Sequence, residues 1–268
     1  MGLLQHMASS LQDWERAERE RSAHEASQTV SSGSLSEPTD GERYVNPPAD
    51  TVYPLEYAFH VLGDVGGKTI LEYGCGDGVN TVLLANRGAQ VISLDISPEL
   101  TAITKQRLRT HGINSGVDVI VGSAHDLPLP DNSVDVVFGI AILHHLDLKL
   151  ASAEVRRVLK DGGLAIFQEP VRNSALMRLA RKLIPYQSPD VSPFERPLTD
   201  KELEDFAVDN SSYKSRPFIL PTTTLLNLIA SRLRPQSVES FVRYDARLLK
   251  KLPALGYYSS VRVIEFRK

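Results

Sequence analysis

Short apolar runs alternate with amphipathic segments through the middle of the chain. The runs rich in β-branched residues predict strands over 68–73, 90–95, 117–121, 134–138 and 164–168. The segments between them that repeat apolar side chains at helical spacing are 79–87, 97–111 and 148–160. Strands that alternate with helices in this way predict βαβ units on a doubly wound, mostly parallel sheet, which is an α/β fold.

The segments before the first predicted strand and after Pro170 show a different pattern of hydrophobic and polar residues. Before the first strand, the pattern predicts a helix over 8–28, a polar linker over 29–42 and a short helix over 55–62. After Pro170, it predicts helices over 173–183, 200–208 and 225–233 and a strand over 213–220. Residues 257–266 alternate apolar and polar side chains, which predicts a final strand near the sheet edge.

These patterns divide the chain into four parts. Residues 1–54 would hold the N-terminal helix, the linker and a lid segment, and residues 55–170 the ligand-binding core. Residues 171–256 would form a helical cap with an insertion, and residues 257–268 the final strand of the sheet.

The composition is that of an ordinary globular protein, with 268 residues, 42% hydrophobic side chains and 24% charged ones. A single cysteine, Cys75, excludes an intrachain disulfide framework and a cysteine-rich zinc cluster. The longest apolar stretches, 134–143 and 218–230, are too short to span a bilayer, and charged residues interrupt any leader pattern. We therefore expect a cytoplasmic protein without stable membrane insertion.

The net charge of −3 hides an uneven distribution. Residues 1–170 carry 13 basic and 23 acidic side chains, a net charge of −10. Residues 171–268 carry 17 basic and 10 acidic side chains, a net charge of +7. This asymmetry suggests that the two parts meet ligands of opposite charge.

The most informative segment is the glycine-rich run LEYGCGDGV over residues 71–79. Its glycines follow a predicted strand and precede a predicted helix, so that the backbone can approach a ligand closely at a helix N-terminus. Asp95 ends the next strand, where an acid can accept hydrogen bonds from the two hydroxyls of a ribose. The segment therefore predicts a nucleoside-binding βαβ unit.

The residues around this loop indicate which nucleoside would bind. The dinucleotide pattern requires a small sixth residue, and here that position is Val79. Glu72, at the end of the first strand, would repel a pyrophosphate but suit a ligand with positive charge. S-adenosylmethionine carries an ammonium and a sulfonium and has no phosphate. A nicotinamide oxidoreductase is the disfavoured rival.

At these residues the chain resembles the class I S-adenosylmethionine-dependent methyltransferases, in particular the type-11 small-molecule group. The matching stretches are 71–79, 91–95, 122–137, 142–146 and 159–170, in family order. The resemblance covers about 55–170 and is specific for the cofactor, not for the substrate. It implies a Rossmann-like sheet of seven strands with the last strand antiparallel.

The resemblance also implies a set of cofactor contacts. At the methionine end it places Glu72, Gly74, Gly76 and Gly139. For the nucleoside it implies Asp95 at the ribose, Ile96 on the adenine, Asp126 at the adenine amino group, and Ala124 and His125 in the same pocket. Cys75 is interpreted as a small loop residue and not as a nucleophile.

Methyl transfer from a sulfonium is an in-line displacement, so the protein mainly positions the reactants. A hydroxyl acceptor also needs a base, and the candidates are His144 and His145, which follow the fourth strand. Each could equally cap or pack against the next helix. Glu169 ends the fifth strand, where it could contact substrate or anchor the loop. No metal is expected, because no carboxylate or cysteine stands at ligand spacing from the histidines.

Two further regions bear on the substrate, and the resemblance implies that the cap over residues 171–256 selects it. Tyr44, Asn46 and Tyr53 precede the core, where they could form a lid over the cofactor or an ordinary aromatic contact. In residues 171–256, basic side chains flank two apolar stretches, 176–184 and 218–230. This arrangement would suit an anionic or lipid-like acceptor, even at a membrane surface, or a plain helical cap with solvated charges. A nucleic-acid partner is not expected, because no basic stretch is interleaved with aromatic residues.

The sequence therefore predicts an S-adenosylmethionine-dependent methyltransferase that acts on a small molecule, with oxygen as the expected acceptor atom. The alternatives are N- or C-methylation of a lipid-like or anionic acceptor, and a non-catalytic regulatory or scaffold protein that binds the cofactor on the same fold.

Overall fold

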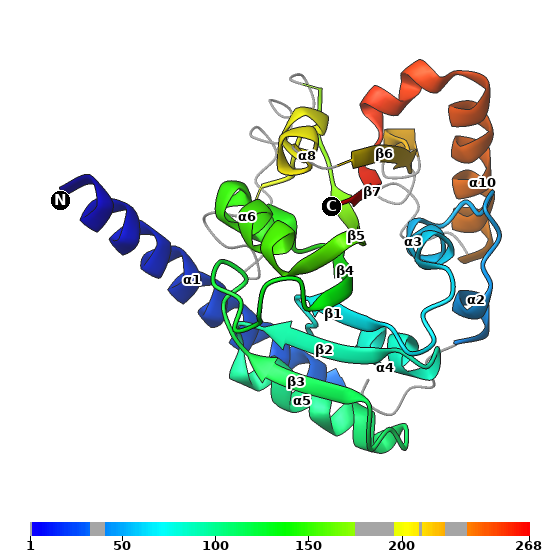
Figure 1. The fold of residues 1–268 in the computed structure, drawn as a ribbon. Helices are drawn as coiled ribbons and strands as arrows, with labels where there is room; N and C mark the ends of the chain where they lie inside the picture. The colour runs from blue at the N-terminus through cyan, green and yellow to red at the C-terminus, as the bar shows by residue number, and fades with distance from the viewer. Residues whose placement is uncertain (1, 33–40, 175–195, 209–210, 223–234) are drawn as a thin grey trace.

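The computed structural model describes residues 2–32, 41–174, 196–208, 211–222 and 235–268. Within these residues, seven strands form one sheet in the order β3-β2-β1-β4-β5-β7-β6, with helices on both faces (Figure 1). The strands are β1 (Thr69–Tyr73), β2 (Gln90–Asp95), β3 (Val117–Val121), β4 (Val134–Ile140), β5 (Leu159–Pro170), β6 (Ser211–Phe218) and β7 (Val261–Arg267).

The α-helices are α1 (Gly2–Ser32), α2 (Glu42–Val45), α3 (Pro54–Leu62), α4 (Val79–Asn86), α5 (Pro98–Thr110), α6 (Leu148–Val158), α8 (Asp200–Phe206) and α10 (Pro235–Lys251). Two 3-10 helices, η2 (Leu143–His145) and η3 (Pro253–Tyr258), follow β4 and α10. No helix in the described part of the chain is long and apolar enough to cross a membrane.

The strand pairing confirms the predicted fold class. Strands β1 to β5 pair in parallel, whereas β7 is antiparallel to both β5 and β6. The last strand is therefore antiparallel as expected, and it lies second from the sheet edge because β6 pairs with its outer side. Parallel strands in this order bring their carboxyl ends to one edge, where a ligand crevice forms.

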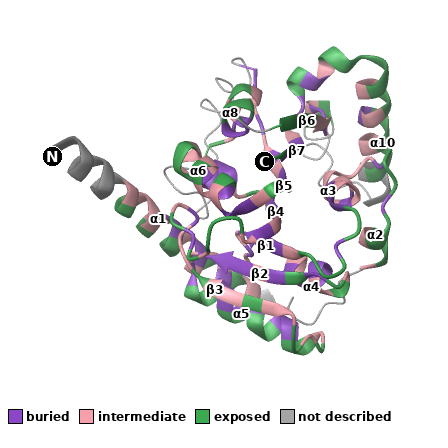
Figure 2. Cartoon of the chain, in the orientation of Figure 1, coloured by how far each residue is buried: buried purple, intermediate pink, exposed green. Residues whose placement is uncertain are grey.

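Two apolar cores hold the helices against the sheet. Successive strand residues point to opposite faces, so Ile70 and Phe138 join the core under α3 and α4, while Leu71 and Val137 join the core under α6 and α8. Figure 2 shows β1 and β2 largely buried, whereas every residue of the edge strand β3 is intermediate or exposed. The centre of the sheet is thus the rigid support on which the crevice is built.

Most predicted elements of the core lie within two residues of their observed bounds, and β2 and β3 match them fully. The structure differs at β5, which begins at Leu159 instead of residue 164, and at the final strand, which begins at Val261 because η3 occupies 253–258. Helix α10 was not predicted. The helices expected over 173–183 and 225–233 and most of the linker over 29–42 lie outside the described residues.

Gly139 of β4 packs directly against a neighbouring side chain. A Cβ at this position would lie 2.5 Å from Phe167 Cδ1 and 2.9 Å from Ile142 Cγ2. Phe167 is fully buried and cannot give way cheaply.

Gly139→Ala should therefore lower the free energy of unfolding by about 1–3 kcal/mol, as measured by urea denaturation. Gly66→Ala is the matched control, because its Cβ would come no closer than 3.4 Å to Asp64. Equal stability of the two variants would contradict tight packing at Gly139.

Candidate functional site

The loop between β1 and α4 follows the carboxyl end of β1 and contributes Gly74 to the site. Gly74 and Gly76 have φ angles of 81° and 52°, in the left-handed region that favours glycine. A Cβ on Gly76 would meet no heavy atom within 4 Å, so the backbone is open on this side. The Gly76 N–H donates to Asp95 Oδ2 at 2.9 Å, which ties the loop to the end of β2.

Asp95 connects the loop to the start of α5. Its Oδ1 accepts a hydrogen bond from the Ser97 N–H at 3.0 Å, and the Ser97 hydroxyl caps the helix by accepting from Leu100 N–H. Burial raises the pKa of Asp95, while the N–H donors of Ser97 and Gly76 oppose that rise. A carboxylate has about four lone-pair sites, so both oxygens of Asp95 can still accept from a ligand.

Glu72 lies beneath the loop and is 2% exposed. Its Oε2 accepts hydrogen bonds from the hydroxyls of Thr81 (2.5 Å) and Ser93 (2.7 Å). Its Oε1 has no hydrogen-bond partner among the described residues. Burial raises the pKa of Glu72 to about 7, although the two hydroxyl donors act in the opposite direction. The structure thus keeps an ionisable acid, with acceptor capacity to spare, directly under the glycine loop.

An ion pair from α5 holds the loop from the other side. Arg107 is 2% exposed, and its Nε donates to the Asp77 carbonyl oxygen at 2.8 Å. Its Nη2 contacts Asp77 Oδ2 at 2.7 Å. The sequence alone gives no sign of this pair, because its members are 30 residues apart and Arg107 lies outside the glycine-rich run.

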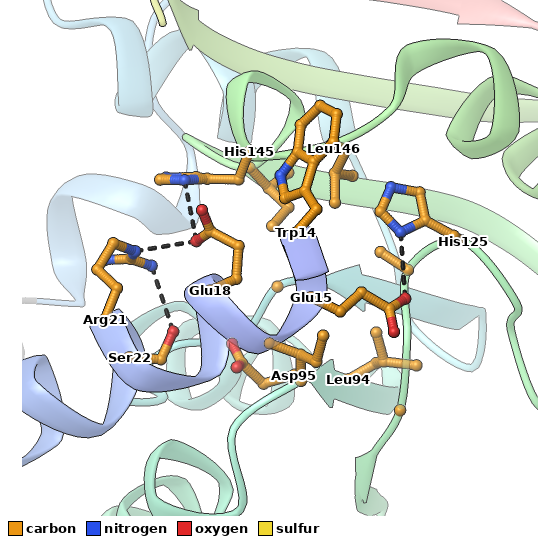
Figure 3. A pocket seen from close by; sticks show the side chains of 15 residues that line it. Trp14, Glu15, Glu18, Arg21, Ser22, Leu94, Asp95, His125, His145 and Leu146 are labelled. Carbon is orange, nitrogen blue, oxygen red and sulfur yellow. Dashed lines mark hydrogen bonds and ion pairs between the residues drawn. The ribbon is translucent and has the colours of Figure 1, made fainter. Parts of the chain in front are cut away.

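A cavity opens at the carboxyl ends of β1 and β2 (Figure 3). With α1 in place, the space in it that water-sized molecules can enter is about 60 Å³, well below the roughly 300–1,000 Å³ that is usual for small-molecule sites. It is lined by Trp14, Glu15, Glu18, Arg21, Ser22, Gly74, Leu94, Asp95, Ile96, Gly122, Ala124, His125, Ile142, His145 and Leu146.

Five of the residues assigned to the cofactor from the sequence lie in this lining, namely Gly74, Asp95, Ile96, Ala124 and His125. His125 Nε2 accepts from the Asp147 N–H at 2.9 Å, which fixes its ring at the start of α6. The other four, Glu72, Gly76, Asp126 and Gly139, are not in the lining, and Asp126 is exposed. The expected contacts of all nine residues with the cofactor stay predictions.

The two histidines after β4 have different surroundings. His144 Nδ1 lies 2.8 Å from Glu169 Oε2, and both side chains are buried. His145 lines the cavity, and its Nδ1 lies 3.2 Å from Glu18 Oε2. The two rings are 4.0 Å apart between centroids. The sequence suggested that one histidine at most would face the ligand, and in the structure His145 lines the cavity.

Glu169 anchors the loop after β4. Its Oε1 accepts from the backbone N–H groups of Ile142 (2.8 Å) and Leu143 (2.7 Å), and its Oε2 contacts His144. Of the two readings left open by the sequence, this geometry supports the anchoring one. Glu169 thereby holds both histidines at the carboxyl end of β4.

Tyr44 and Tyr53 lie around α3, outside the cavity lining. The Tyr44 ring packs 5.2 Å from Phe59, and the Arg43 guanidinium lies 4.8 Å from the Tyr53 ring centroid. Their part in a lid stays a prediction. The cavity is bordered instead by α1, to which the sequence analysis gave no role.

The sequence contains a partial signal for the α1 side chains that line the cavity. Glu15, Glu18 and Ser22 recur at the spacing of one helix face. Nothing in the sequence indicates which part of the fold this face covers, because residues 33–40 separate the helix from the elements that follow.

The described residues hold no group of three or more histidine, cysteine, aspartate or glutamate side chains that could bind a metal ion. Cys75 is buried, and burial raises the pKa of its thiol well above the usual value. A protonated thiol is a poor nucleophile, in keeping with its interpretation as a small loop residue.

Comparisons with known sequences point to one family. A family model described as "Methyltransferase domain" matches residues 71–167, from β1 to β5. A Mycolicibacterium smegmatis protein named "Probable S-adenosylmethionine-dependent methyltransferase" is 36% identical over 107 residues, which are 40% of this chain and 39% of that protein. The malonyl-[acyl-carrier protein] O-methyltransferase of Serratia marcescens is 31% identical over 102 residues, 38% of each chain. The matched part thus spans about two fifths of the length of these relatives.

The fold resembles that of solved structures over a greater length. Geranyl diphosphate C-methyltransferase from Streptomyces coelicolor A3(2), in complex with Mg²⁺, geranyl diphosphate and S-adenosyl-L-homocysteine, gives a TM-score of 0.56 at 18% identity. The likeness covers 79% of this chain and 77% of that one. At this identity it shows a shared fold.

Glu72 should give the protein a characteristic pH dependence of stability. Because its pKa is about 7 when folded and 4.5 as the ordinary value, its contribution is fully present below pH 4.5 and is lost as the pH rises through 7. Glu72→Gln removes this ionisation. Between about pH 5 and pH 8 in urea unfolding, the variant should lose less stability than the parent protein, by up to roughly 3 kcal/mol. Parallel pH profiles of the two proteins would contradict the shift.

Proposed function

We propose that this chain, whose residues 71–167 form a class I S-adenosylmethionine-dependent methyltransferase domain, transfers a methyl group from that cofactor to a small-molecule acceptor. The observation that carries the proposal is the hydrogen bond between Gly76 and Asp95. It sets an open glycine backbone beside an acid with spare lone pairs, at the edge where a doubly wound sheet binds ligands.

The residues of the cavity fit this cofactor in charge and hydrogen bonding. Asp95 can accept from two ribose hydroxyls, and Ile96 and Ala124 supply apolar contacts for the adenine. Asp77 and Asp95 lie close enough to Glu72 to raise its pKa further, and Arg107 pairs with Asp77. Asp95, which lines the cavity, favours a cationic ligand over a phosphate. When bound, the sulfonium supplies an electrophilic methyl group.

We propose that the methyl acceptor is an oxygen whose proton is removed by a histidine. Glu169 accepts the hydrogen bond from His144 Nδ1, so Nδ1 carries the hydrogen and Nε2 the lone pair. A buried carboxylate that fixes the tautomer of a histidine is a common arrangement for orienting a general base. His145 is the second candidate, because it lines the cavity itself.

We further propose that the acceptor has a negatively charged group and an apolar part. A groove between α10 and the end of β6 supports this proposal. Its described lining includes four basic side chains, Arg216, Arg243, Arg247 and Lys250, and a single acid, Asp50. Apolar residues, among them Phe218 and Leu249, line the rest. Geranyl diphosphate, bound by the structural neighbour, is a molecule of this kind.

Experiment can distinguish this proposal from two alternatives, methylation at another atom and a non-catalytic role. The relative from Serratia marcescens is an O-methyltransferase and the structural neighbour a C-methyltransferase, so the acceptor atom has to be identified in the product. Cofactor binding without methylation of any acceptor would favour a regulatory or scaffold protein. The discriminating experiment is incubation with labelled S-adenosylmethionine and an extract of the source organism, followed by mass spectrometry of the labelled product.

Asp95→Ala should raise the dissociation constant for S-adenosylmethionine by about ten- to a hundredfold. The variant removes the carboxylate that would accept from the ribose hydroxyls and that accepts from the Gly76 N–H of the loop. Isothermal titration calorimetry measures this change. Asp118→Ala, an exposed acid on the edge strand β3, is the matched control and should leave the affinity unchanged. Equal affinity in the two variants would exclude Asp95 as the ribose ligand.

His144→Ala should leave cofactor affinity near that of the parent protein, because His144 is outside the described lining of the cavity, whereas His145 lies in it, so turnover of His145→Ala is compared at saturating cofactor. Turnover of the identified acceptor should fall by about a hundredfold in the variant that lacks the base. Initial rates at saturating cofactor measure the effect. Full rates in both variants would show that no histidine acts as a base.

A further inference from the structure

The turn between α10 and η3 exposes apolar side chains to solvent. Leu252 is 54% exposed, and Pro253 and Ala254 beside it are exposed as well. Tyr257 and Tyr258, at the end of η3, are 50% and 48% exposed. Figure 2 shows the turn after α10 mostly in the colour of exposed residues. Exposed apolar side chains that gather in one short segment are typical of an interaction site, whereas single ones need no explanation.

Three basic side chains stand beside this turn. Arg247, Lys250 and Lys251, near the end of α10, are exposed and form no ion pair within the part of the chain that the structure describes. From 240 to 264 the sequence has a single acid, Asp245, which is 1% exposed and accepts a hydrogen bond from a backbone N–H. The exposed charge of this segment is therefore entirely positive.

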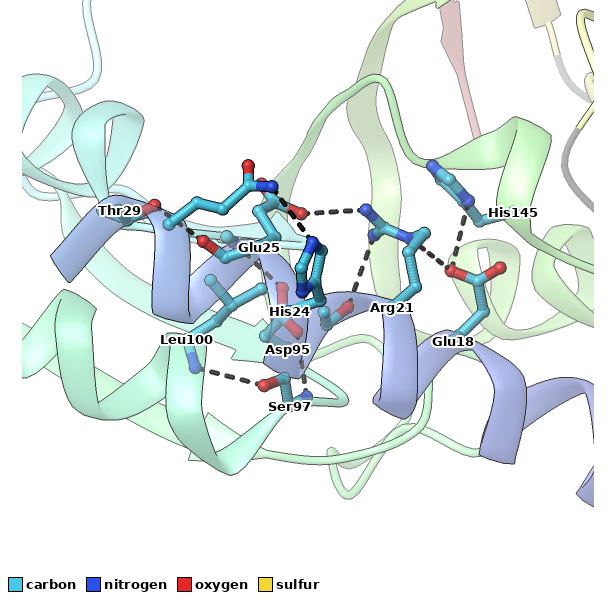
Figure 4. A network of polar contacts seen from close by, with 12 residues as sticks. Glu18, Arg21, His24, Glu25, Thr29, Asp95, Ser97, Leu100 and His145 are labelled. Atoms are coloured by element: carbon cyan, nitrogen blue, oxygen red, sulfur yellow. Dashed lines mark hydrogen bonds and ion pairs between the residues drawn. The ribbon is translucent and has the colours of Figure 1, made fainter. Parts of the chain in front are cut away.

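Some cations on other helix surfaces have carboxylate partners of their own. On α1, Arg21 lies 3.0 Å from Glu18 Oε2 and 2.8 Å from Glu25 Oε2 (Figure 4). The helix macrodipole accounts for basic residues in a last turn, but it gives no reason for apolar side chains that stay exposed beside them. The combination of both in residues 247–258, which we call the basic corner, therefore indicates a partner.

The basic corner adjoins the groove between α10 and the end of β6. Lys250 and Pro253 line that groove together with Phe218 and Leu249. Water-sized molecules can enter about 650 Å³ of it, within the roughly 300–1,000 Å³ that is usual for small-molecule sites. A ligand with an apolar part and an anionic group would thus meet the same two residues in the groove and at the corner.

A lipid surface fits this combination better than a protein does. Lysine is depleted in protein interfaces, whereas Lys250 and Lys251 directly precede the apolar Leu252. At a bilayer surface, the long lysine stems let the ammonium groups reach the phosphates while an apolar neighbour enters the headgroup layer. Tyrosine is enriched at the same depth, because its ring is apolar and its hydroxyl polar. Anionic lipids supply the charge that the three cations complement.

We propose that the basic corner docks this protein on anionic lipid membranes. Leu252 and Tyr258 enter the headgroup layer, and Arg247, Lys250 and Lys251 bind the lipid phosphates. This inference goes beyond the proposed function and does not require it. If the acceptor is the anionic, partly apolar molecule proposed above, docking brings the groove to the surface where such molecules accumulate.

Vesicle binding by the full chain tests the docking without cofactor, so its outcome is independent of the proposed function. We expect the protein to co-sediment with phosphatidylcholine vesicles that contain phosphatidylglycerol, and to bind vesicles of phosphatidylcholine alone about tenfold more weakly or less. Binding should also weaken as the salt concentration rises, because salt screens exposed charges. No binding to the anionic vesicles would overturn the proposal and favour an acidic protein as the partner of the same surface.

The double variant Lys250→Glu and Lys251→Glu should lower the partition coefficient for anionic vesicles by about twentyfold or more, because each cation near such a surface contributes a factor of about five. Lys105→Glu with Arg109→Glu is the matched control, since both residues are exposed on α5. Figure 1 shows α5 at the opposite end of the molecule from the basic corner. Equal losses in the two double variants would mean that net charge alone decides binding, which overturns the assigned surface.

Leu252→Ser tests the apolar part of the corner. Vesicle binding should fall about three- to tenfold at low and at high salt alike, because burial of an apolar side chain does not depend on charge. Leu150→Ser is the control, because Leu150 on α6 is 39% exposed. Circular dichroism should show the same helix content in all variants. Unchanged binding by Leu252→Ser would overturn the entry of this turn into the headgroup layer.

Discussion

The hydrogen bonds that Asp95 accepts from Gly76 and Ser97 are the interactions on which the site depends. They join the end of β2 to the glycine loop on one side and to the start of α5 on the other. A loop with three glycines has many conformations in the unfolded chain, and fixing it is costly. The pair of Arg107 with Asp77 adds a second attachment from α5. A flexible segment is thereby held in one shape, ready to receive a ligand.

The charge distribution of the chain has a counterpart in space. The acids Glu72, Asp77 and Asp95 gather at β1, β2 and the loop between them, where burial raises the pKa of Glu72 to about 7. The basic residues Arg243 and Arg247 lie on α10, beyond the opposite edge of the sheet from β3. In the order of the sheet, β4, β5 and β7 lie between these two regions.

The sequence was a good guide wherever local chemistry decides structure. Strand residues such as those of β2, and the helix start at Ser97 and Pro98, follow from periodicity and capping. The position of the crevice could also be predicted locally, from the glycine-rich run and from Asp95 at the end of a predicted strand. Contacts between distant segments had no such signal: the pair of Glu18 and His145 joins residues 127 positions apart. Helix α10 was overlooked although the sequence signals it, because apolar and charged side chains recur at helical spacing along Pro235–Lys251. The contact of its buried Asp245, which accepts from the Leu220 N–H, has no such local signal.

The place of β7 in the sheet has a consequence for the order of folding. Its residues pair with β5, about a hundred positions earlier in the chain, and supply the observed partner of β6. The strands that carry the crevice, β1, β2 and β4, end by Ile140 and can pair while a nascent chain is still growing. Until residues 261–267 are available, β5 presents an unpaired edge to other chains. The half of the sheet that forms the crevice can thus assemble before β7 is available to cover the edge of β5.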